Sequence, residues 1–76
     1  LMRNVTTHTG RLEILGRMPS SRNGNPRYRL RVDGWTCCTP VDSQLGYSVP
    51  NMDGKTVQAE IGTFRGVPML RYAKPS

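Results

Sequence analysis

The arginines of residues 27–32 are the clearest candidate for binding chemistry in this sequence. The segment RYRLRV alternates an arginine with an apolar or aromatic residue at every step. This alternation predicts a half-buried strand with Arg27, Arg29 and Arg31 on its exposed face. Side chains on one face of a strand are about 6.6–6.8 Å apart, close to the phosphate spacing along one nucleic-acid strand. The row therefore predicts a polyanion-binding stripe, and a solubilising face is the alternative.

Further cations extend this surface. Arg11 and Arg17 lie on the polar side of another alternating segment, residues 11–18, and share the outer face if the two strands pair antiparallel. Guanidinium groups form forked hydrogen bonds to phosphates and carboxylates, which favours anionic ligands. The predicted binding residues, for nucleic acid or for an acidic partner, are Arg11, Arg17, Arg22, Arg27, Arg29, Arg31, Arg65 and Phe64.

Two kinds of partner fit this surface. Eleven Lys and Arg against five Asp and Glu give a net charge of +6, which attracts nucleic acid and acidic proteins alike. Proteins that bind single strands usually place aromatic rings beside their cations, whereas Tyr28, Trp35 and Tyr72 are predicted to point inward here. Only Phe64 and Tyr47 then remain for stacking. An acidic host protein, anchored by Trp35 or Phe64 at the rim, is the alternative partner.

Residues that could carry catalysis are sparse. The one histidine, His8, lies in a predicted arm, and the five carboxylates are scattered along the chain. Cys37 and Cys38 are adjacent and point to opposite faces of a strand, so we expect two free thiols with Cys38 exposed. These residues lack the ligand spacing of a metal site, and the glycines do not form a phosphate loop. The sequence predicts a non-enzymatic binding module without metal or cofactor.

Cysteine usage also suggests a compartment. Free thiols in so small a domain favour the cytoplasm, because small secreted domains usually carry disulfides. The chain contains no apolar run of about 18 residues and no signal-peptide pattern near its start, so we expect no membrane partner.

Two turns set the predicted strand pairing. Asp33-Gly34 and Arg65-Gly66 both suit the two-residue hairpin turn, which fixes the register of the flanking strands. The first turn predicts the pairs Val32–Trp35, Arg31–Thr36, Leu30–Cys37 and Arg29–Cys38. The second predicts the pairs Ile61–Leu70, Glu60–Arg71 and Ala59–Tyr72. Gly16 predicts a bulge or bend in the first strand.

Together these elements predict an all-β domain. We expect a small five-stranded antiparallel barrel over residues 10–74, preceded by a flexible arm at residues 1–9, with a short edge segment there as the alternative. One helical turn or structured loop within residues 41–49, between the third and fourth strands, plugs an open end of the barrel. The candidate plug residues are Leu45, Tyr47 and Val49.

The core and the free edge are predicted as well. Seventy-six residues allow one hydrophobic core. We expect Trp35 to be buried in it beside Leu30, Val32 or Ile14. Pro68 cannot donate to a strand ladder, so the fifth strand is predicted to be an edge there, or Pro68 to lie at a bulge. An exposed edge could pair with a second copy in a homodimer.

Two resemblances follow from these segments. The order of three meandering strands, a connector and a final hairpin resembles that of the oligonucleotide/oligosaccharide-binding (OB) barrel. A Src-homology-like small barrel is the alternative. The segments GRLEILGRMPSSRNGNPRYRLRVDG, VDSQLGYSVPNMDGKTV and AEIGTFRGV resemble small uncharacterised proteins of actinobacterial phages. That second resemblance implies expression in a bacterial host cytoplasm and supplies no catalytic or binding residues.

Overall fold

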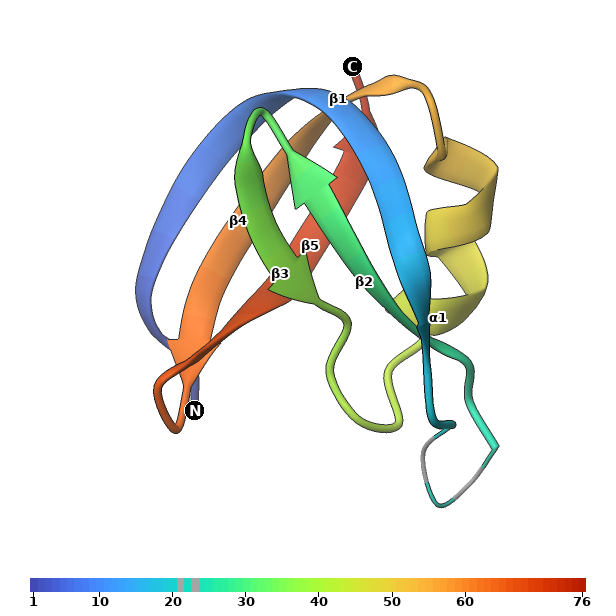
Figure 1. Cartoon of the computed structure of the whole chain (residues 1–76). Coiled ribbons are helices and arrows are strands. Elements are labelled where there is room, and N and C mark those ends of the chain that lie inside the picture. The colour runs from blue at the N-terminus through green and yellow to red at the C-terminus, as the bar shows by residue number, and fades with distance from the viewer. Residues whose placement is uncertain (21, 23) are drawn as a thin grey trace.

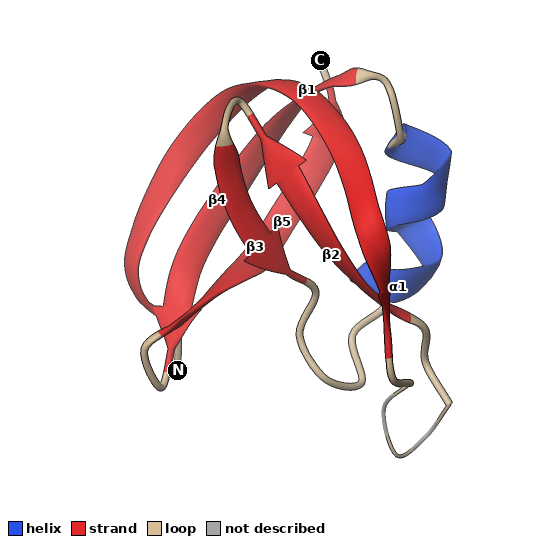
Figure 2. Ribbon diagram, in the orientation of Figure 1, coloured by secondary structure: helices blue, strands red, loops and turns tan. Residues whose placement is uncertain are grey.

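A computed structural model describes residues 1–20, 22 and 24–76, and its five strands form one mixed sheet that closes into a ring (Figure 1). Around the ring the order is β1-β2-β3-β5-β4 and back to β1. A short helix and a 3-10 turn follow β3 and lie beside the strands (Figure 2). The elements are β1 (Arg3–Met18), β2 (Arg27–Val32), β3 (Trp35–Cys38), α1 (Leu45–Ser48), η1 (Val49–Met52), β4 (Thr56–Phe64) and β5 (Val67–Pro75).

The predicted element order is confirmed, including the short helix between the third and fourth strands. The prediction that all strands pair antiparallel is wrong, because β3 and β5 run parallel and meet at the pair Cys38–Met69. This single pair completes the ring, whereas the other four junctions are longer antiparallel ladders. The seam between β3 and β5 is therefore the weakest junction of the sheet.

The long strand β1 belongs to two ladders. Its first part pairs with β4 and its second part pairs with β2. The arm predicted at residues 1–9 is instead paired strand from Arg3 onward. This segment is rich in threonine, which suits a strand, but its inward position His8 is polar and hides the alternation. The predicted bulge is present between Ile14 and Gly16, where Leu15 is the extra residue.

Both predicted hairpin turns are present. The β2–β3 register has all four predicted pairs, from Val32–Trp35 at the turn to Arg29–Cys38. The β4–β5 turn is also two residues long, since Phe64 pairs with Val67. The four turn residues, namely Asp33, Gly34, Arg65 and Gly66, all have positive φ. Positive φ at both central residues matches the twist of the flanking strands, and it explains how these two dipeptides fix the register.

A second bulge changes the outer half of the β4–β5 hairpin. Ile61 pairs with Leu70 as predicted, but the next pair is Glu60–Tyr72 because Arg71 is an extra residue on β5. The slip of one residue moves Tyr72 from the predicted inner face to the outer face, where it is 48% exposed. The expected Glu60–Arg71 charge pair still forms, with 3.8 Å between Arg71 Nε and Glu60 Oε1.

One apolar cluster fills the ring. Its buried members are Leu12, Leu30, Val32, Cys37, Val49, Met52, Val57, Ala59, Ile61 and Leu70. Trp35, predicted to be buried, is 58% exposed. It lies next to the hairpin turn, at the first position of β3, where its ring packs on buried His8 with 4.8 Å between the ring centroids. Trp35 therefore covers the core instead of filling it.

The connector packs one side of this cluster. Val49 is buried and Leu45 packs on the cluster, as predicted, whereas Tyr47 is 53% exposed and is not a plug residue. Gly46, which the helix propensity scale disfavours, is buried against Pro26. A Cβ atom at residue 46 would overlap the carbonyl oxygen of Pro26. The missing side chain therefore lets α1 approach the start of β2.

Candidate functional site

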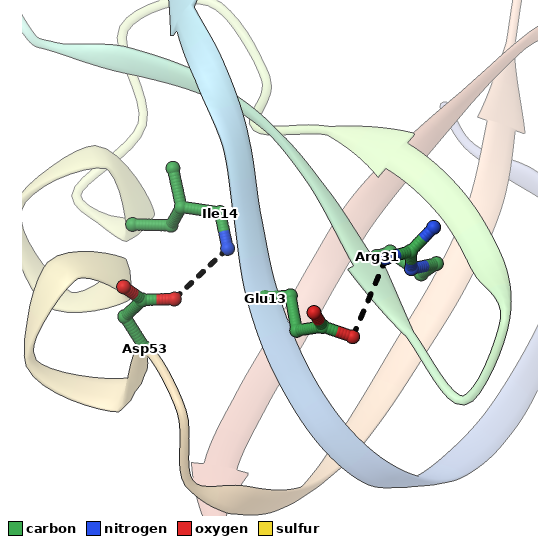
Figure 3. A network of polar contacts seen from close by, with 4 residues as sticks. All are labelled: Glu13, Ile14, Arg31 and Asp53. Atoms are coloured by element: carbon green, nitrogen blue, oxygen red, sulfur yellow. Dashed lines mark hydrogen bonds and ion pairs between the residues drawn. The ribbon is translucent and has the colours of Figure 1, made fainter.

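The arginine row lies on the outer face of β2, as predicted, but its members have different surroundings. Arg31 is half-buried, and its Nη2 lies 3.5 Å from Oε1 of Glu13, which is opposite it on β1. Figure 3 shows this pair on one side of β1. Both side chains are about half exposed, so the ion pair contributes little stability, yet Glu13 partly neutralises the charge of Arg31.

Arg27 is committed to the fold. Its Nε and Nη2 donate to the carbonyl oxygen of Thr39 at 3.1 and 2.9 Å. Thr39 is fully buried, and its hydroxyl oxygen accepts a hydrogen bond from the backbone nitrogen of Tyr28. The guanidinium thus satisfies a carbonyl at the point where the β2–β3 ladder ends. Arg27 is therefore a structural residue first.

Arg29 differs from both neighbours because it is exposed and uncommitted. Within residues 1–20, 22 and 24–76, the structure shows no hydrogen bond or ion pair of its side chain. Its Nη2 lies above Gly16 of β1, 3.9 Å from where a Cβ would be. The bulge at Leu15 and the absent side chain of Gly16 leave room for the guanidinium there.

An apolar hollow adjoins Arg29. It has a volume of about 370 Å³. Its lining comes from the end of β1, from β2, β3 and the start of β5: Met18, Arg29, Thr36, Cys37, Cys38, Val67 and Pro68. Apart from Arg29 and the Thr36 hydroxyl, these side chains offer apolar or sulfur surface. A flat apolar group carrying a negative charge fits this combination of one guanidinium and an apolar wall.

The other predicted cations do not gather at the hollow. The β1 bulge places Arg17 opposite Tyr28, on the other face from the arginine row, and Met18 takes the outer position beside Arg27. Arg11 is exposed but lies in the part of β1 that pairs with β4. The prediction that Arg17 shares the outer face is therefore wrong.

The two loop cations have separate positions. Arg22 is exposed in the loop between β1 and β2. Arg65 lies in the β4–β5 turn, where its guanidinium carbon is 5.2 Å from the ring centroid of Phe64. This cation–π contact covers one face of the ring, so Phe64 is less available for stacking than the sequence suggested.

The aromatic distribution differs most from the sequence prediction. Trp35, Tyr47 and Tyr72 are each about half exposed, so three rings can stack on a ligand. Alternation predicted that Trp35 and Tyr72 point inward. It takes no account of the position of Trp35 at the start of β3 or of the bulge at Arg71. The lack of exposed rings, which counted against nucleic acid, does not hold in the structure.

Asp53 has a structural role beside β1. Oδ1 of Asp53 accepts a hydrogen bond of 2.9 Å from the backbone nitrogen of Ile14, on the opposite side of β1 from Glu13 (Figure 3). This bond extends the contacts between β1 and the segment before β4, where the Gly54 nitrogen donates to the Leu12 carbonyl oxygen. Asp53 therefore fixes β1 just before its bulge.

Cys38 is not the exposed thiol that the sequence predicted. It is 6% exposed, accepts a 3.7 Å contact from Arg27 Nη2 and donates to the Pro68 carbonyl oxygen at 3.6 Å. Its pairing with β5 at the ring seam covers the sulfur. Cys37 is 3% exposed, and burial, with a smaller contribution from Cys38, raises the pKa of Cys37 to about 12.

We expect neither thiol to react with Ellman's reagent in the native protein at pH 8, and both to react in guanidinium chloride. Burial blocks access, and the raised pKa keeps Cys37 in the unreactive protonated form.

The pKa of Cys37 also makes the stability depend on pH. The unfolded chain loses the Cys37 proton near pH 9 and the folded chain only near pH 12, so the free energy of unfolding falls as the pH rises between these values. Cys37→Val should reduce that loss, and rapid native labelling would contradict the burial.

Other site types find no support in the described part of the chain. It contains no group of three or more His, Cys, Asp or Glu side chains placed to hold a metal ion. Its helices are all too short to cross a bilayer. Comparison of the chain with protein-family models, with curated proteins and with solved structures finds no match.

Proposed function

We propose that this chain is a small, non-enzymatic binding module that contacts the phosphates of single-stranded nucleic acid through the outer face of β2 and β3. The observation that carries the proposal is Arg29, an exposed and uncommitted guanidinium at the edge of an apolar hollow of about 370 Å³. A nucleotide offers both complements, since its phosphate pairs with a guanidinium and its base has an apolar face.

The topology supports this assignment. The strand order β1-β2-β3-β5-β4, with a connector helix between β3 and β4, resembles the OB barrel more than a Src-homology-like barrel. OB barrels bind oligonucleotides on the face of strands 2 and 3, next to the loops after strands 1 and 4. The hollow lies on that face and is bounded by Val67 and Pro68, which follow the β4–β5 turn. A fold alone does not define a function, and it is the hollow beside Arg29 that supplies the binding chemistry.

The net charge of +6 adds a long-range electrostatic attraction for the phosphates of nucleic acid. Fluorescence polarisation of labelled dT12 and of a duplex, over a salt series from about 50 to 200 mM, tests the proposal. We expect log K for dT12 to fall linearly with log salt, and Arg29→Ala to reduce that slope by about one. Lys55→Ala removes the same charge at an exposed position away from the hollow and is the matched control.

Three outcomes decide the test. Weaker binding with a smaller slope in Arg29→Ala, but not in Lys55→Ala, supports the proposal. Equal effects of both substitutions would show a general charge effect and no site at the hollow. The absence of any dT12 binding at about 50 mM salt would overturn the nucleic-acid assignment, because electrostatic affinity is greatest at low salt.

The exposure of Trp35 favours a second candidate, an acidic protein partner in a bacterial host cytoplasm. A tryptophan that is 58% exposed can anchor a protein interface, where aromatic and arginine side chains carry much of the binding energy. In this case Trp35→Ala should abolish capture of the partner, and oligonucleotides should not compete. The fifth strand is not the free edge that the sequence predicted, because β5 pairs with β4 and, at Met69, with β3. A homodimer through the rest of its β3 side would instead appear as a concentration-dependent mass in sedimentation.

A further inference from the structure

A second, larger groove lies between the connector and β5. It has a volume of about 600 Å³ and opens to solvent. The connector contributes one wall and β5 the other: Ser43, Gln44, Leu45, Tyr47, Ser48, Asn51, Arg71 and Tyr72. The bulge on β5 creates the second wall, because the extra residue Arg71 turns Tyr72 outward.

Two tyrosine rings give this groove its stacking surface. Tyr72 is 48% exposed and Tyr47 is 53% exposed. The hydroxyl of Tyr47 donates to Oδ1 of Asn25 at 3.4 Å, which holds that ring in place. Among the described residues, no hydrogen bond, ion pair or ring contact restrains the Tyr72 side chain, so its ring is available to a ligand.

Some polar side chains of the groove already make hydrogen bonds within the protein, whereas others are open to a ligand. The hydroxyls of Ser43 and Ser48 bond to the backbone of Leu45, so they serve the helix. The amides of Gln44 and Asn51 are exposed and make no hydrogen bond that the structure describes in residues 1–20, 22 and 24–76. Each amide offers two donors and an acceptor, which is the set that reads the edge of a base.

The charge of the groove selects for an anion. Among the described residues, no carboxylate belongs to its lining, and Arg71 is the one cation there. The ion pair of Arg71 with Glu60 is long, at 3.8 Å, and the Arg71 side chain is 59% exposed, so the guanidinium can also approach a phosphate. A nucleotide carries the three complements together, namely a ring face, a hydrogen-bonding edge and a phosphate.

We infer that this groove binds one base of the nucleic acid, with Tyr72 stacking on its face, Gln44 and Asn51 bonding its edge, and Arg71 contacting a phosphate. The inference rests on the proposed function and extends its site. Pro68 at the hollow and Tyr72 at the groove lie four residues apart on β5, about 13 Å along the strand. That distance is within the reach of the roughly 4–16 nucleotides that one OB fold contacts.

Binding of dT12 and of an abasic oligonucleotide with the same number of phosphates tests the inference. We expect Tyr72→Ala to weaken dT12 binding by about 5- to 150-fold, the equivalent of about 1–3 kcal/mol for one stacked base, and to leave abasic binding unchanged. Tyr72→Phe keeps the ring and should retain most of the affinity. Arg29→Ala should weaken both oligonucleotides, because the hollow contributes a phosphate contact.

The two proposals fail in different ways. Normal dT12 binding by Tyr72→Ala would overturn the groove and leave the hollow intact. No dT12 binding by the unmodified protein would overturn both. Equal loss of dT12 and abasic binding in Tyr72→Ala would assign that residue to the fold or to phosphate contacts, against the inference. Binding of maltohexaose that Tyr72→Ala abolishes, without an effect on dT12, would assign the groove to a neutral sugar instead.

Discussion

Leu30→Ala should remove about 2–5 kcal/mol of stability, which is the usual cost of truncating a fully buried leucine. Leu30 has no exposed surface and lies in the central cluster, opposite Ile14 on one side and Cys37 on the other. A core in so small a domain rarely supplies more than about 3–5 kcal/mol, so much of the variant should be unfolded at 25 °C. Urea unfolding followed by far-UV circular dichroism measures this loss.

Trp35→Ala is the contrasting variant. Because Trp35 is 58% exposed and only covers His8, its removal should cost less than about 1 kcal/mol despite its larger side chain. The emission maximum of Trp35 in the native protein should likewise lie near that of an exposed indole. A larger destabilisation by Trp35→Ala than by Leu30→Ala would contradict the position of this side chain.

Gly46→Ala should destabilise the protein by about 1–3 kcal/mol or more through overpacking. A Cβ atom there meets the backbone oxygen of Pro26, which cannot move aside as a flexible side chain would. The sign is diagnostic, because alanine favours an ordinary helix by about 1 kcal/mol over glycine. Thermal unfolding of both proteins gives the comparison.

Gly16→Ala is the matched control for this change. Its Cβ atom would meet only the end of Arg29, at 3.9 Å, which is ordinary van der Waals contact. We expect a change within about 0.5 kcal/mol for Gly16→Ala. Similar losses for both substitutions would show that glycine content, and not the Pro26 contact, sets the stability.

Local signals in the sequence were sufficient for the two hairpins. Asp33-Gly34 and Arg65-Gly66 require positive φ at both residues, and this local chemistry fixed the pairing of β2 with β3 without reference to the rest of the chain. The same logic predicted the first pairs of β4 with β5. It failed beyond Leu70, because a bulge such as the one at Arg71 depends on contacts with distant segments and has no residue signature there.

The predictions of a flexible arm and of a buried Trp35 were wrong for a related reason. Residues 3–9 have few apolar side chains, so their strand character depends on the partner β4, which follows some fifty positions later. Trp35 lies on the same face as the core residues of its hairpin, but it is the first residue of β3. An inward-pointing side chain at that position reaches only the rim of the ring. Alternation gives the face of a residue and not its depth.

The candidate site shows the same limit. Alternation correctly placed Arg27, Arg29 and Arg31 on one face of β2. It could not show that Arg27 donates to Thr39 and that Arg31 pairs with Glu13, which leaves Arg29 as the uncommitted member of the row. The β1 bulge was predicted at Gly16, yet its effect on Arg17 was not, because the bulge shifts every later residue to the opposite face.

The double role of β1 also determines when this protein can fold. Thr6 of β1 contacts the carbonyl of Ile61, which lies 55 positions further along the chain. At about 5–20 residues per second, a ribosome needs about 3–11 s to make that segment, and during this time the first half of β1 has no partner. The β2–β3 hairpin, closed by a two-residue turn, can form meanwhile in about 1–10 μs. The first half of β1, which is synthesised well before its partner β4, is therefore expected to take its place late.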